Sequence, residues 1–88
     1  MAEITVTPVG ETYRVTVTEG DTSTVHDVTV DESDVARLGN GASDAELIAA
    51  SFRFLLDREP KESILSSFDL VVIGRYFPDY PSEVAGYL

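Results

Sequence analysis

Alternating apolar and polar residues dominate the first third of the chain. Three such segments, separated by short glycine-containing turns, predict an antiparallel β-meander over residues 3–30, apolar on one side and threonine-rich on the other. Pro8 cannot donate to a strand ladder, so the first strand is expected to lie at a sheet edge or to end near this residue. The apolar side of the meander is expected to present Ile4, Val6, Tyr13, Val15, Val17, Val28 and Val30.

The spacing of apolar residues becomes helical after the meander. Asp31 is a suitable N-cap for a short helix, and Ser43 with Glu46 forms an S-x-x-E capping box that opens a longer helix over residues 44–57. Pro60 ends this helix and can begin a further short helical piece. Residues 32–88 are therefore expected to be largely helical.

The run SFDLVVIGRYFPDY, residues 67–80, suits both a strand and a helix, since its successive β-branched residues favour extended structure. Ser67 is an acceptable N-cap and Pro78 stops the run, so we predict a helix over residues 68–77. A final turn or short helix follows it. The helical part is expected to add to the core Ile48, Phe52, Leu55, Leu65, Leu70, Ile73 and Phe77.

The patterns together predict an α+β fold. Residues 1–88 are expected to form a single domain, in which a three-stranded antiparallel β-meander (residues 3–30) has one face covered by C-terminal helices (residues 32–88). A chain of this length supports one modest core and no deep, lid-covered active site.

The chain is strongly acidic, with 16 Asp and Glu against 6 Lys and Arg and a formal net charge of -10. The negative charges of such a surface repel one another in ordinary salt and disfavour the compact state. Molar salt shortens the Debye length to about 3 Å and removes most of this repulsion. The composition therefore favours a halophilic, salt-rich cytoplasm, with an acidic mesophilic protein as the alternative. No signal-like or membrane-spanning stretch is evident, so a cytoplasmic protein without membrane contact is expected.

The sequence offers little recognisable chemistry. Without cysteine there is no disulfide, thiolate nucleophile or Cys-ligated metal. His26, the single histidine, lacks a G-x-S-x-G partner motif and is interpreted as a strand residue half covered at the sheet edge, with a minimal enzyme or ligand site as the alternative. Helix capping explains the acidic run of residues 31–34, so we expect no metal, no cofactor and no catalytic residue.

Basic and aromatic residues interleave in the second half of the chain, which is the one indication of nucleic-acid affinity. Acidic residues in the same window leave no net positive charge to release counterions from a phosphate backbone, so nucleic acid is not expected as a partner. A small regulatory or nucleic-acid-associated protein remains the alternative function. The residues that would serve it are Arg53, Arg58, Lys61 and Arg75.

The aromatic residues of the second half fit best as core, but some of them could form an exposed face. The leading hypothesis is therefore a non-enzymatic protein-interaction module that binds an unknown protein partner or forms a homodimer. It would use either the edge strand near Pro8 or a surface of aromatic and basic side chains. The members of that surface are Phe54, Arg58, Arg75, Tyr76 and Tyr80.

The stretch SFRFLLDREPKESILSSFDLVVIGRYFPDY, residues 51–80, resembles a group of short prokaryotic proteins. These proteins carry a similar FLL-REP-x-ESIL and FDL-x-x-I-x-x-YFP pattern after a valine-rich strand region. The acidic version in this chain looks like a haloarchaeal member of that group. The resemblance implies a shared fold, and it carries no activity, cofactor or catalytic residue to this chain.

Overall fold

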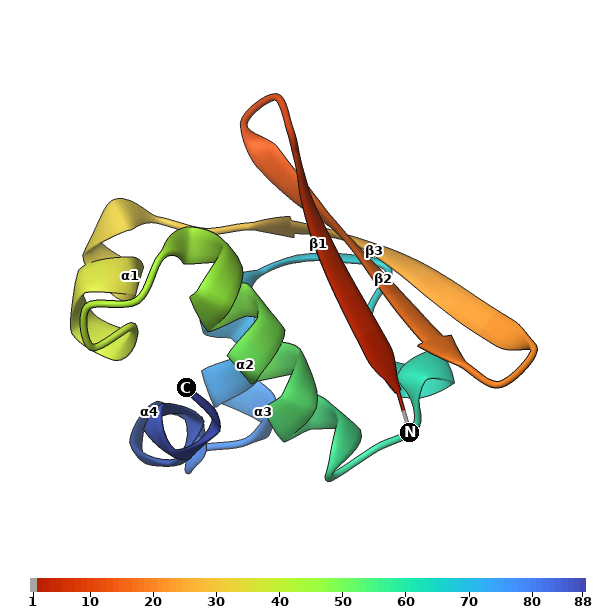
Figure 1. The fold of residues 1–88 in the computed structure, drawn as a ribbon. Coiled ribbons are helices and arrows are strands. Elements are labelled where there is room, and N and C mark those ends of the chain that lie inside the picture. The colour runs from red at the N-terminus through yellow and green to blue at the C-terminus, as the bar shows by residue number, and fades with distance from the viewer. Residues whose placement is uncertain (1) are drawn as a thin grey trace.

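The computed structural model describes residues 2–88 as a sheet with helices packed on one side of it (Figure 1). The strands are β1 (Glu3–Val9), β2 (Thr12–Glu19), β3 (Thr22–Thr29) and β4 (Ser67–Asp69), in the spatial order β1-β2-β3-β4. The helices are α1 (Glu32–Leu38), α2 (Asp44–Leu56), α3 (Ile73–Tyr76) and α4 (Tyr80–Glu83). Three short 3₁₀ turns complete the chain: η1 (Lys61–Ser63), η2 (Leu70–Val72) and η3 (Val84–Tyr87).

The antiparallel meander of β1, β2 and β3 confirms the prediction from alternation. Val15, Val17 and Val28 are fully buried, and their neighbours along each strand face the open side of the sheet. Gly10 and Gly20 take positive φ angles of 63° and 59° in the two hairpin turns, a conformation that glycine adopts without strain.

A fourth strand corrects the prediction of a three-stranded sheet, and with it the prediction of one helix over residues 68–77. β4 pairs parallel to β3, with Val28 opposite Phe68, and the Asp27 N–H donates to the Ser66 carbonyl at 2.8 Å. Helical structure begins only at Leu70. The extended conformation is favoured at residues 67–69 because it provides hydrogen-bond partners for backbone groups on β3 that a helix at these positions would leave unpaired.

The helix starts follow the predicted capping. The Asp31 side chain accepts from the Ser33 N–H, and Ser43 and Glu46 make both hydrogen bonds of the capping box. α2 is the longest helix, and it runs alongside β1 in the opposite chain direction (Figure 1). Among residues 2–88 no helix combines the length and apolar character needed to cross a membrane.

The core lies between the sheet and α2, with the C-terminal turns closing its far side. One predicted core residue is wrong, because Leu65 is 46% exposed while its neighbour Ile64 is 7% exposed. The backbone at Ile64 is extended, so the two side chains point in opposite directions. The other predicted core residues are buried or packed against the core, which also includes Leu38, Leu47, Ala50, Phe54, Ile64, Tyr80 and Val84.

Candidate functional site

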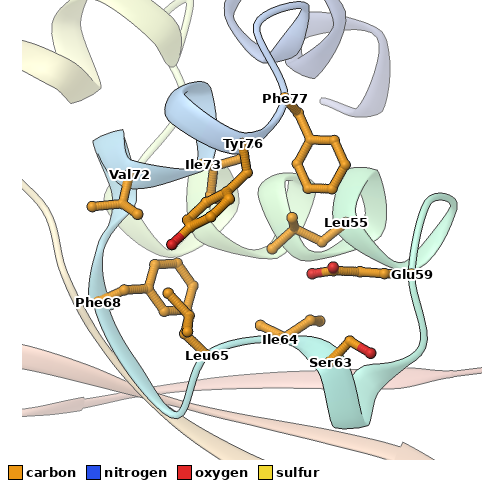
Figure 2. Close-up of a pocket in the computed structure, with 10 residues that line it drawn as sticks. All are labelled: Leu55, Glu59, Ser63, Ile64, Leu65, Phe68, Val72, Ile73, Tyr76 and Phe77. Atoms are coloured by element: carbon orange, nitrogen blue, oxygen red, sulfur yellow. The ribbon is translucent and has the colours of Figure 1, made fainter.

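An apolar groove opens between the end of α2 and the segment that carries β4 and α3 (Figure 2). Its cavity volume is about 290 Å³. The buried side chains of Leu55 and Ile73 form the floor of the groove, and the loop after α2 forms one of its walls. The groove is lined by Leu55, Glu59, Ser63, Ile64, Leu65, Phe68, Val72, Ile73, Tyr76 and Phe77.

The rim of the groove exposes large apolar side chains. Tyr76 is 66% exposed and Leu65 is 46% exposed, while Phe68 and Phe77 are half-buried. Figure 2 shows the Tyr76 ring projecting from α3 towards Phe68, with Phe77 across the opening. A contiguous set of exposed apolar side chains around a hollow is typical of an interaction surface.

Glu59 is the charged member of the groove. The Glu59 N–H donates to the Leu55 carbonyl at 2.9 Å, which extends the end of α2 and directs the side chain towards the cavity (Figure 2). Burial raises the pKa of the Glu59 carboxyl above its ordinary value, because partial desolvation disfavours the charged form. Within residues 2–88 no cationic side chain forms a salt bridge with it. A cation arriving in the groove would therefore find an uncompensated carboxylate.

Two residues of the predicted interaction surface belong to the core. Phe54 is fully buried, and its ring packs 5.3 Å from Tyr80 and 5.9 Å from Phe77, centroid to centroid. Tyr80 is 1% exposed; burial raises the pKa of its hydroxyl, which lies 2.7 Å from the Ser51 Oγ. A partner therefore cannot reach Phe54 or Tyr80 on the folded surface. Tyr76 is the aromatic member of the predicted surface that stays exposed.

The basic residues of the predicted set lie in different environments. Arg58 stacks 3.7 Å above the Phe54 ring centroid and forms a salt bridge with Asp79 at 3.0 Å. The Lys61 side chain is 6% exposed, and its Nζ lies 2.6 Å from a Glu62 oxygen. Arg53 and Arg75 are exposed on α2 and α3. The arrangement gives no continuous stripe of free cations for a phosphate backbone.

His26 lies inside the sheet rather than at its edge, which corrects the predicted half-exposed position. His26 is 2% exposed, because the Phe52 ring and the segment around Leu65, which leads into β4, lie against it. Nδ1 lies 2.7 Å from the Leu65 carbonyl and Nε2 lies 2.8 Å from the Thr24 hydroxyl. A carbonyl only accepts, so Nδ1 donates to it, and Nε2 of the neutral ring accepts from the threonine. Both nitrogens have structural partners.

The acidic run of α1 is used within the helix. Asp31 caps the helix, and Asp34 pairs with Arg37 at 2.9 Å. Over the described part of the chain, no three His, Asp or Glu side chains gather where they could hold a metal ion. The groove beside Glu59 is therefore the best-defined candidate site of this structure.

Comparisons with protein-family models, with curated proteins and with solved structures find no match for this chain.

Proposed function

We propose that the protein is a non-enzymatic interaction module whose groove binds a positively charged amphipathic segment of a partner protein. The observation that carries the proposal is an exposed apolar hollow with an unpaired, partly buried carboxylate in its wall. Apolar walls favour an apolar anchor from the partner, and Glu59 favours a lysine or arginine beside that anchor.

The dimensions of the groove support a peptide anchor rather than a small-molecule substrate. Its volume of about 290 Å³ lies at or below the lower end of pockets that enclose drug-sized ligands, roughly 300–1,000 Å³. Interfaces commonly depend on a few large side chains inserted into such hollows. Leu65 and Tyr76 stand at the rim, where they would cover the flanks of an inserted side chain.

The charge of the whole molecule supports a cationic partner. A net charge of -10 attracts basic segments and disfavours acidic ones within about one Debye length, which is about 10 Å at 0.1 M salt and about 3 Å at 1 M. In molar salt the attraction is therefore confined to charges at the groove itself. A peptide whose apolar face is flanked by lysines therefore matches both the groove and its surroundings.

The first prediction concerns binding of a short helical peptide built of leucine and lysine. We expect it to shift the amide NMR signals of groove residues, and we expect Leu65→Lys to weaken its binding at least tenfold, or about 1.4 kcal/mol. The matched control is Val25→Lys, because Val25 is 51% exposed on the helix-free face of the sheet. Equal weakening by both variants would show general charge effects and refute the groove. A peptide with glutamate in place of lysine is expected not to bind.

The same titration has a pH dependence through Glu59. A cationic peptide favours the charged carboxylate, whereas burial raises the pKa of the free protein's Glu59. Binding is therefore expected to weaken as the pH falls from neutrality through that raised pKa. Glu59→Gln should weaken binding at pH 7 and remove this part of the pH dependence. A peptide affinity that follows pH identically in the Glu59→Gln variant would contradict the role of this carboxylate.

The second prediction concerns salt and follows from the proposal that the protein works in a salt-rich cytoplasm. The melting temperature is expected to rise as KCl increases from about 0.1 M to about 1 M, since the Debye length falls from about 10 Å to about 3 Å. A variant with Glu11→Gln, Asp21→Asn and Glu32→Gln removes three exposed charges and should show a smaller rise. A wild-type protein equally stable in dilute buffer and in molar KCl would refute the proposal.

A further inference from the structure

The outer edge of β1 is open. Ile4 and Val6 stay partly exposed, although Val15, Val17 and Val28 on the central strands are fully buried, because no strand of residues 2–88 lies beyond β1. Pro8 lies inside the strand opposite Tyr13, and a proline nitrogen fits a ladder only where it points away from the neighbouring strand. Hydrogen-bonding direction alternates along a strand, so Ile4 and Val6 present their N–H and C=O groups to the same open edge.

A groove of about 610 Å³ runs beside this edge, between β1 and α2. On the α2 side it is lined by Ala45 and Ala49, one helical turn apart, whose small side chains let another helix approach closely. Glu46 and Arg53 border the same groove. They are two turns apart on one side of the helix, so the groove carries a negative end and a positive end.

The face of α2 that carries Ala45, Ala49 and Arg53 points away from the core and borders the groove beside β1. The buried side of the helix faces the core, and Ala49 and Arg53 lie outside it, on the side that borders the groove. The buried residues of the helix are Leu47, Ile48, Ala50, Ser51, Phe52, Phe54 and Leu55. Figure 1 shows α2 and β1 side by side with opposite chain directions. A molecule that covered the β1 edge would therefore also meet the alanine face of α2.

We propose that a second copy of this chain covers this face, with the two β1 strands paired antiparallel about a two-fold axis. The same axis sets the two α2 helices antiparallel, so that Glu46 faces the partner's Arg53 and Arg53 faces the partner's Glu46. Within residues 2–88 Arg53 makes no salt bridge, and the one hydrogen bond of its side chain is a 3.5 Å contact to the Tyr87 carbonyl. This charge complementarity, together with the self-complementary strand edge, selects a copy of the chain as the occupant.

The hydrogen-bonding pattern of β1 fixes a register. With Thr5 on the two-fold axis, Ile4 exchanges both backbone hydrogen bonds with the partner's Val6, and Val6 does so with the partner's Ile4. Glu3 then lies opposite the partner's Thr7, so no like charges oppose one another along the strands. The inference is independent of the groove that contains Glu59.

A cysteine pair tests this register, because the natural chain contains no cysteine. Thr5→Cys places two thiols across the axis, with Cβ atoms about 5 Å apart and within reach of a disulfide. Thr7→Cys, on the same exposed face of the same strand, places them about 13 Å apart. We expect Thr5→Cys to give a disulfide dimer under mild oxidation and Thr7→Cys to give at least tenfold less. Equal yields, or no dimer from Thr5→Cys, would overturn the proposal.

Sedimentation equilibrium of the full chain tests the helix contact. At a fixed KCl concentration we expect wild type to dimerise, Arg53→Glu to weaken the dimer at least tenfold, and Glu46→Arg combined with Arg53→Glu to restore much of it. Circular dichroism checks that each variant is folded. A monomeric wild type, or an Arg53→Glu variant that sediments like wild type, would overturn the proposal. Leu65→Lys should leave the dimer unchanged, which separates this test from that of the proposed function.

Discussion

Replacing Phe54 with alanine is expected to lower the free energy of unfolding by about 3–5 kcal/mol. The side chain is fully buried where α2 meets the C-terminal turns, and its ring lies against Phe77, Tyr80 and Tyr87. Arg58 would also lose the ring beneath its guanidinium. Since small domains are stable by only about 5–15 kcal/mol, the loss takes a large share of the total.

Urea unfolding followed by circular dichroism measures this effect. Phe54→Leu keeps part of the buried area, so its free energy of unfolding is expected to fall between those of wild type and Phe54→Ala. It therefore gives a measurable loss of stability even if the alanine variant does not fold. The matched control is Tyr76→Ala, expected to change stability by about 0.5 kcal/mol or less because the side chain is 66% exposed. Similar losses at Phe54 and Tyr76 would contradict their assignment to core and surface.

Replacing His26 with alanine is expected to cost about 2–4 kcal/mol of stability. The variant loses the contact with the Phe52 ring, at 5.3 Å between centroids, and leaves the Leu65 carbonyl without its donor. It also removes the link that holds residues 64–66 against β3. Local opening there should speed hydrogen exchange at the Asp27 amide, which donates to the Ser66 carbonyl.

Val25→Ala provides the comparison for His26→Ala, because Val25 lies next to it on β3 with its side chain 51% exposed. We expect this control to leave the Asp27 amide protected. An unchanged unfolding free energy in His26→Ala would mean that the histidine is not a structural link. Such a result would instead favour the hypothesis of a ligand or catalytic site around this residue.

The parts of the fold that depend on local pattern were predictable from the sequence. Alternation predicted the meander, and the capping residues Asp31, Ser43 and Glu46 predicted where two helices begin. The strand β4 was not predictable in the same way. Its residues suit either conformation, and the choice depends on the distant edge of β3, which a local reading of the sequence does not include.

The candidate site was predictable only in part. Tyr76 was predicted to belong to an exposed surface and is 66% exposed, whereas Phe54 was assigned to the same surface and is fully buried. The C-terminal turns supply a second neighbour that covers it. Leu65 and Glu59 were missed as members of a groove. The usable signal was the Ile64-Leu65 pair after Pro60, since an extended backbone turns one of two adjacent apolar residues outward.

The parallel pairing of β3 with β4 also bears on how the chain reaches its native state. The strands of the meander follow one another directly in sequence. Asp27, in contrast, pairs with Ser67, and α1 and α2 lie between these two residues along the chain. Contacts so distant in sequence close late because the intervening loop must be ordered first. On a ribosome the meander would emerge with both edges unprotected, and docking of β4 would be the step that covers the β3 edge, while the β1 edge stays open.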